Sequence, residues 1–475
     1  MTPPRRLLVV AAGLCLAGCP APPTREGAAP AAPAPGNRLN VLLVTIDTLR
    51  ADHLGAYGYR RPTSPRMDAL AERGAVFENA CTFWPKTRGS FVAMMTGRQP
   101  SKSGYSKMHP LVLGFNTTIA DALRGAGYRT AAIVDNPNVA AQHGFAKGFD
   151  AFRETWEEGG LDTEMDRTRA ITEGGIAFLR DAGSERPFFL WLHYVNPHAP
   201  YTPPPPFDTA FLDSGARGGP RLPVVPGYHG GIPKQWAVAG QDRLAYYVAQ
   251  YDGEIAAVDQ EVGRVLGALE ASGAADRTLV VLTSDHGESL GEHAYYFDHG
   301  EDLFEPSLAV PLIVAGPTVP AGMRSASFAS TLDVFPTVLD AVKVSYPPDL
   351  AGESLLPALA AGVSTRRERL FAQNDRNLSA SWDRRFKVVA APVPDGRRFA
   401  LYDRKADPGE TRDVAAAMAD QLRVHRRELE LFLERADREW IQTRRAVEGA
   451  PGEAPITAGA CENLRALGYV GSCPH

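Results

Sequence analysis

The sequence lacks a long apolar segment and an excess of positive charge. Beyond the first twenty residues, no stretch reaches the roughly 20 apolar residues that a membrane-spanning helix needs. Lys and Arg number 50 against 55 Asp and Glu, which gives a formal charge of −5 over 475 residues. No basic field therefore argues for nucleic-acid binding, and positive charge at any anion site has to be local. What remains is ordinary globular composition, with 44% hydrophobic and 22% charged residues.

The N-terminus has the pattern of an export signal. Arg5 and Arg6 precede an apolar run at 7–16 that is too short to span a bilayer. The run ends in Leu-Ala-Gly-Cys at 16–19, which resembles a bacterial lipobox. We expect residues 1–18 to be a lipoprotein signal peptide and Cys19 to carry lipid. The protein would then be exported and lipid-anchored to the bacterial cell envelope, at the inner or outer membrane, on the periplasmic or surface side. The alternative is an ordinary signal peptide with a chance cysteine.

Cysteine is scarce, with five in the chain. Cys15 would leave with the signal peptide and Cys19 would be lipidated, so at most one disulfide can form. Cys461 and Cys473 are close in sequence and could pair in an oxidising compartment. Residues 19–38 are dominated by Pro and Ala, which predicts a flexible tether.

Apolar runs alternate with amphipathic segments from residue 39 onward. Continuous apolar runs typical of buried parallel strands occupy 40–46, 130–134, 188–192, 279–283 and 312–315. Helical patterns lie between them at 117–126, 163–182 and 242–271. The alternation predicts an α/β domain over 39–365, with a large, mostly parallel sheet sandwiched by helices. Residues 366–475 predict a small C-terminal α+β subdomain, with strands at 385–389 and 399–402 and a helix near 414–439.

Acidic residues follow two of the predicted strands. Asp47 ends the run at 40–46, and Asp285-His286 follows the run at 279–283. Ligands bind beyond the carboxyl ends of strands in open α/β sheets, so these side chains are expected at one rim. Two adjacent carboxylates repel unless a cation lies between them, and two oxygens with an imidazole nitrogen suit a divalent metal. The alternative is that each Asp caps a turn.

A third element lies between these strands. The segment at 91–97 predicts a helix that Gly97 ends, and Thr87 lies at its start. Backbone N–H groups at a helix start favour an anion, and a metal-bound hydroxyl there could act as a nucleophile. From spacing alone, an N-cap role for Thr87 is favoured.

Several segments together resemble the sulfatase family of the alkaline phosphatase superfamily. They are NVLLVTIDTLRADHLGAYGY at 40–59, FFLWLHYVNPHAPY at 188–201, SDHGESLGEH at 284–293, HG at 299–300, VPLIV at 310–314, LYD at 401–403 and DPGE at 407–410. These segments occur in the family's order and cover roughly residues 39 to 415.

The resemblance implies a role for each matching position. Asp47, Asp285 and His286 match metal ligands of one divalent ion. That ion is calcium by resemblance, although an imidazole ligand would also suit zinc or manganese. His198 matches a residue that binds the anionic group of the ester, and His299 falls near a residue that faces the leaving group. For His193 and His293, a structural role and a direct role stay open.

The sequence departs from the usual sulfatase motif at the nucleophile. Thr87 stands where the formylglycine cysteine is expected, Gly89 replaces the motif's Pro, and Phe91 replaces its Arg. Thr48 replaces a second Asp, and Cys81 is out of register. A threonine here resembles phosphodiesterases and phosphoethanolamine transferases of the same superfamily, in which Thr is the metal-bound nucleophile.

Lys86 and Arg88 flank Thr87, and they could take over anion binding from the missing Arg or be solvated surface charges. We therefore predict a metal-dependent hydrolase that cleaves sulfate or phosphate esters through Thr87. Its substrate would be an anionic ester, for example one derived from a glycan or lipid, with a membrane as partner through the anchor and no nucleic acid. The alternatives are a phosphoryl or phosphoethanolamine-type transferase and an inactive sulfatase-like binding protein.

Overall fold

A computed structural model describes residues 38–106, 113–183, 185–212, 218–361, 365–447 and 456–473. The proposed signal peptide, the lipidation site at Cys19 and the tether up to residue 37 lie outside the described residues. Within those residues, no helix is both long enough and apolar enough to cross a membrane.

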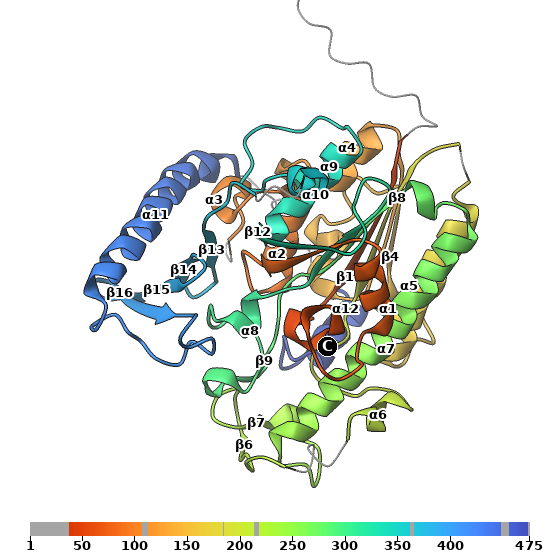
Figure 1. The fold of residues 1–475 in the computed structure, drawn as a ribbon. Coiled ribbons are helices and arrows are strands. Elements are labelled where there is room, and N and C mark those ends of the chain that lie inside the picture. The colour runs from red at the N-terminus through yellow and green to blue at the C-terminus, as the bar shows by residue number, and fades with distance from the viewer. Residues whose placement is uncertain are drawn as a thin grey trace, which may run out of the picture. The chain divides into compact units, whose positions relative to one another are not determined.

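The core of the protein is an eight-stranded sheet with the order β12-β2-β11-β8-β1-β5-β3-β4 (Figure 1). Strand β1 lies in its middle and pairs in parallel with β5 and β8, with Ile46 opposite Tyr194 and Ser284. Every residue of β1 is buried, which explains its continuous apolar run. The strands are β1 (Asn40–Ile46), β2 (Ala75–Cys81), β3 (Arg129–Val134), β4 (Ala151–Glu154), β5 (Phe188–Tyr194), β8 (Thr278–Ser284), β11 (Leu312–Ala315) and β12 (Met323–Ser330).

Strand β11 corrects one prediction. The run at 312–315 is a buried strand, but it is antiparallel to both β8 and β2, with Leu312 opposite Thr283. An apolar run does not reveal strand direction, which depends on the connection. The chain between β8 and β11 has no crossover helix, and contains only β9 (Ser289–Leu290), a 3-10 turn, β10 (Tyr296–Asp298) and α8 (Glu305–Leu308). The segment 285–311 therefore leaves and re-enters the sheet at the carboxyl edge of β8.

Helices cover both faces of the sheet. Side chains of Leu42 and Val44 pack with α1 (Pro65–Glu72), α5 (Glu164–Asp181) and α7 (Leu244–Ala271). Those of Val41 and Leu43 pack with α2 (Thr87–Thr96), α4 (Ile119–Gly125) and α9 (Val334–Ala341). The observed α4, α5 and α7 confirm the three predicted helices, and the layered, mostly parallel α/β fold is confirmed with them.

A second, antiparallel sheet forms the predicted C-terminal subdomain. It contains β13 (Leu370–Gln373), β14 (Ser379–Trp382), β15 (Phe386–Val393) and β16 (Gly396–Asp403), and α11 (Ala419–Val447) packs beside it. The predicted boundary at 365/366 stays a prediction. The remaining short elements are α3 (Pro100–Ser103), β6 (Val224–Val225), β7 (Ile232–Pro233), α6 (Phe207–Ala210) and α10 (Leu356–Ala361).

The chain ends in α12 (Ala458–Ala466) and a short tail. A disulfide joins Cys461 in α12 to Cys473 in the tail, as the sequence allowed. Cys81 is a buried free thiol at the end of β2, packed among Leu303, Phe328 and Trp382. Burial raises the pKa of this thiol, so it is an inert core residue.

Candidate active site

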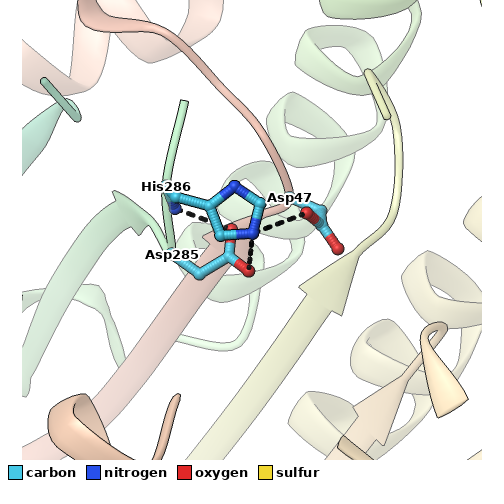
Figure 2. A group of neighbouring side chains, drawn as sticks. All are labelled: Asp47, Asp285 and His286. Atoms are coloured by element: carbon cyan, nitrogen blue, oxygen red, sulfur yellow. Dashed lines mark hydrogen bonds and ion pairs between the residues drawn. The ribbon is translucent and has the colours of Figure 1, made fainter. Parts of the chain in front are cut away.

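Three predicted metal ligands meet at the carboxyl edge of the sheet. Asp47 follows β1, and Asp285 and His286 follow β8, so the parallel register brings the two strand ends together (Figure 2). One ligand atom from each residue lies within 4.8 Å of the others. His286 Nε2 is 3.3 Å from Asp285 Oδ2 and 3.8 Å from Asp47 Oδ1.

The hydrogen bonds of these residues leave one oxygen of each carboxylate without a partner. Asn136 Nδ2 donates to Asp47 Oδ2 at 2.6 Å, and the His286 backbone N–H donates to Asp285 Oδ1 at 3.0 Å. The other two oxygens, Asp47 Oδ1 and Asp285 Oδ2, are buried and accept no hydrogen bond. Such orphaned buried oxygens are costly unless a cation occupies the space between them.

The protonation chemistry of the group agrees with a cation site. Burial, followed by the charge of Asp285, raises the pKa of Asp47 well above its usual range. Burial also raises the pKa of Asp285 to about 7 and lowers that of His286 to about 3. The carbonyl of Gly287 is 3.0 Å from His286 Nδ1 and accepts a hydrogen bond from its N–H, which leaves the Nε2 lone pair toward the carboxylates. Two carboxylate oxygens and a neutral imidazole nitrogen therefore fit a divalent ion.

Thr87 lies beside this group. It is the first residue of α2, it is buried, and its Oγ1 is 3.2 Å from His286 Nε2. Ser90 Oγ donates to the carbonyl of Asp285 at 2.7 Å and ties the first turn of α2 to the end of β8. The same turn packs against Trp84 at Gly89, where an added Cβ would lie 2.3 Å from the indole ring. Glycine at this position thus lets the helix start close to Asp47, Asp285 and His286, which we call the metal group.

Two further histidines and a lysine surround the hydroxyl. The rings of His286 and His299 are 4.1 Å apart between centroids, and those of His198 and His299 are 5.2 Å apart. Burial lowers the pKa of His198 to about 4 and that of His299 well below its usual range. Lys86 precedes α2, and its side chain packs against Gly300, where an added Cβ would lie 2.5 Å from Cε. Its charge acts on His286 and His299, so this lysine belongs to the same site.

Three other candidate residues make contacts with the protein itself. The Arg88 guanidinium donates to His143 Nε2 at 2.9 Å. His193 is fully buried beneath the site, with its Nε2 3.8 Å from Asp47 Oδ2 and its ring against Phe91. The ring of His293 stacks on Phe304 with centroids 3.5 Å apart. The substrate contacts of Arg88 and His193 remain predictions.

The structure adds two residues that the sequence analysis missed. Asn136 lies two positions after the end of β3, so the rule that found Asp47 could also have found it. The hydroxyl of Tyr469 lies 3.2 Å from Thr87 Oγ1 and 3.0 Å from His198 Nε2. No motif marks Tyr469, because it reaches the site from the far end of the chain.

Comparison with known proteins defines the class. Residues 39–344 match the Sulfatase family, and residues 291–434 match the family described as N-sulphoglucosamine sulphohydrolase, C-terminal. The chain belongs to the sulfatase family, and its sulfatase relatives are sulfuric ester hydrolases.

Individual relatives agree with this class. The chain is 25% identical to an N-acetylglucosamine-6-O-sulfatase of Bacteroides thetaiotaomicron, over 86% of this chain and 87% of that protein. It is 28% identical to the human N-sulphoglucosamine sulphohydrolase, over 76% and 83% of the two chains. Its fold is similar to that of a phosphonate monoester hydrolase of Agrobacterium radiobacter, with a TM-score of 0.70, 23% identity, and 85% and 96% of the two chains covered. The family match and the two curated relatives favour a hydrolase over the transferase and the inactive binding protein.

Proposed function

We propose that this protein is a metal-dependent hydrolase of sulfate esters that uses Thr87 as its nucleophile. The observation that carries the proposal is the position of Thr87 Oγ1, which lies 3.2 Å from His286 Nε2. The unpartnered oxygens Asp47 Oδ1 and Asp285 Oδ2 face the same nitrogen. A divalent ion held by Asp47, Asp285, His286 and Thr87 would lower the pKa of the hydroxyl and neutralise charge on the transferred group.

The residues around Thr87 then have distinct tasks. Thr87 Oγ1 attacks the sulfur and releases its proton to solvent, and the bond from sulfur to the alcohol oxygen breaks as the Thr sulfate ester forms. Lys86 holds the oxygens of the transferred group, and His198 does so in its doubly protonated form, since the neutral ring presents a lone pair at Nε2. His299 donates a hydrogen bond to the departing oxygen, which takes up a proton as it leaves. Glu288 Oε1, 3.4 Å from His299 Nδ1, orients that ring. Water then attacks the sulfur of the Thr ester, the bond from sulfur to Thr87 Oγ1 breaks, sulfate is released, and one proton of the water passes to Thr87 Oγ1.

The names of two curated relatives support a proposal for the substrate class. Both curated relatives carry names of sulfatases that act on glucosamine derivatives. We therefore propose a sulfated sugar as substrate rather than a phosphate ester.

The test compares Thr87→Ala with Thr87→Ser, on a sulfated glucosamine, an aryl sulfate and an aryl phosphodiester. We expect Thr87→Ala to lower kcat by about 10³-fold or more and Thr87→Ser to retain part of the activity, because a hydroxyl remains. Full activity in Thr87→Ala would refute the nucleophile. Faster turnover of the phosphodiester than of either sulfate would refute the substrate class.

We also propose that Cys19 anchors the enzyme to the cell envelope through lipid. Expression of the full chain with radiolabelled palmitate should label the wild type and leave Cys19→Ala unlabelled. Equal labelling of both proteins would contradict this proposal.

A further inference from the structure

The C-terminal segment brings a phenol hydroxyl to the reacting atoms. Besides its contacts with Thr87 Oγ1 and His198 Nε2, the ring of Tyr469 lies 5.3 Å from that of His198 and 6.3 Å from that of His299. Tyr469 thus faces three residues to which the proposed mechanism assigns a task. The mechanism described above does not use it.

The local structure that positions Tyr469 is well defined. Helix α12 ends with the Tyr469 N–H donating to the carbonyl of Leu464 at 2.9 Å and the Gly468 N–H donating to that of Arg465 at 3.1 Å. This is the hydrogen-bond pattern of a Schellman cap, with glycine in the left-handed conformation at φ 80°. An added Cβ at Gly468 would lie 2.6 Å from the Trp236 ring, so the turn is fixed from outside as well.

A covalent closure holds the same turn. Cys461 is buried in α12, and its disulfide to Cys473 encloses Tyr469 in a loop. Leu464 and Leu467 are buried beside it, and Thr457 caps the start of the helix by accepting from the Ala460 N–H at 3.1 Å. The segment 456–473 is therefore anchored at both ends of the stretch that carries Tyr469.

The hydrogen bonds show which way the phenol donates. His198 Nδ1 is 2.6 Å from the carbonyl of Ala199 and donates to it, so Nε2 presents a lone pair. The Tyr469 hydroxyl is the donor in this contact, because a phenol carries an O–H and the lone pair on Nε2 can only accept. An ester oxygen that reaches both Thr87 and His198 necessarily comes within reach of the same rotatable hydroxyl. Phe91 stands where a sulfatase arginine is expected, so this position supplies no donor to the anion.

We infer that Tyr469 is a substrate-binding residue, whose hydroxyl donates a hydrogen bond to a nonbridging oxygen of the transferred sulfate, and that the disulfide-closed segment 456–473 serves to hold it there. This inference rests on the proposed function for the identity of the transferred group. It adds a contact from outside the parts of the chain that match the sulfatase families, which end at residue 434.

The experiment measures binding of inorganic sulfate to the purified full-length protein by isothermal titration calorimetry. We expect Tyr469→Phe to weaken sulfate binding by about tenfold to a hundredfold, because the lost bond is to a charged acceptor. The matched control is Tyr346→Phe, which removes a phenol hydroxyl packed near Phe335, away from the site. It should leave sulfate affinity unchanged. Thermal unfolding of Tyr469→Phe should match the wild type, which separates loss of a contact from loss of structure.

Unchanged or tighter sulfate binding by Tyr469→Phe would overturn the inference, since the hydroxyl would then only fill the empty site or compete with the anion. The role of the disulfide is tested by Cys461→Ser with Cys473→Ser. In that background the effect of Tyr469→Phe should shrink, and an undiminished effect would show that the disulfide does not hold the tyrosine. Sulfate binding includes no covalent step, so its loss in Tyr469→Phe would stand even if Thr87→Ala proved active.

Discussion

Asn136 governs how Asp47 presents its carboxylate. Its amide donates to Asp47 Oδ2 at 2.6 Å, which leaves Oδ1 as the oxygen that faces His286. We predict that Asn136→Ala weakens binding of the divalent ion by about 10-fold to 100-fold, as is usual when a hydrogen-bond partner of a ligand is removed. Competition with a chelating dye would measure this affinity. Asn79→Ala removes an amide that donates to the Ala326 carbonyl, and it is a suitable control. Equal affinities for wild type and Asn136→Ala would contradict the prediction.

The metal-ligand residues that could be predicted from the sequence all follow directly after an apolar run. They are Asp47, Asp285 and His286, and the parallel register of β1 and β8 then brings them together. Tyr469 has no such signal, because its position depends on a helix cap, a disulfide and the ring of Trp236. Contacts of this kind join distant segments and leave no local pattern. The interpretation that Thr87 replaces the formylglycine cysteine depends on the family motif alone, and it stays a prediction.

At the scale of elements, the Asp259 side chain in α7 caps the first turn of α1 and so joins the two helices. It accepts from the backbone N–H groups of Arg66 and Met67, in the first turn of α1, at 3.0 and 2.8 Å. Burial raises the pKa of Asp259 to about 7. The pKa of Asp259 is therefore higher in the folded chain than in the unfolded chain, where it is near 3.9. Such a carboxyl contributes its full stabilisation below the unfolded-state pKa, and this contribution is lost as the pH rises through about 7.

The prediction from Asp259 is therefore a pH-dependent difference between two proteins. As the pH rises from about 4 to about 8, wild type should lose up to ~4 kcal/mol of unfolding free energy relative to Asp259→Asn. Asparagine keeps an acceptor for the first turn of α1 and cannot ionise. Urea unfolding of both proteins at several pH values gives the difference directly. A difference that stays constant across this range would show that Asp259 titrates alike in the folded and unfolded chain.

Elements with a single strong pattern could be predicted, and elements with mixed patterns could not. Strand β1 is buried throughout, whereas β2 includes Glu78 and Asn79 and β12 begins with partly exposed residues. Those two strands lie toward one edge of the sheet, where one face stays near solvent and the apolar run is interrupted. Strand β11 was found but given the wrong direction, because direction belongs to the connection and not to the strand. That connection, 285–311, also carries His286, Glu288 and His299 to the active-site edge.

At the scale of the whole molecule, the metal group links function to stability. Burial and the charge of Asp285 raise the pKa of Asp47, so the ion-free folded protein favours a protonated Asp47 and loses stability as the pH rises. A cation that binds the folded chain alone offsets this cost, and contributes about 2.7 kcal/mol at a free concentration 100 times its Kd. Chelation at pH 7.5 should therefore lower the unfolding temperature of wild type by several degrees.

The variant with Asp47→Asn and Asp285→Asn separates repulsion between the carboxylates from any general effect of the chelator. It carries neither buried carboxylate, so its unfolding temperature should not respond to chelation, and it should exceed that of chelated wild type. The same variant should be inactive, because it has lost both oxygen ligands. Differential scanning calorimetry of wild type and of the double variant, each with and without EDTA, measures these unfolding temperatures on one scale. A wild type that unfolds at the same temperature in both conditions would mean that no tightly bound ion joins Asp47 to Asp285, and the proposed role of Thr87 would lose its physical basis.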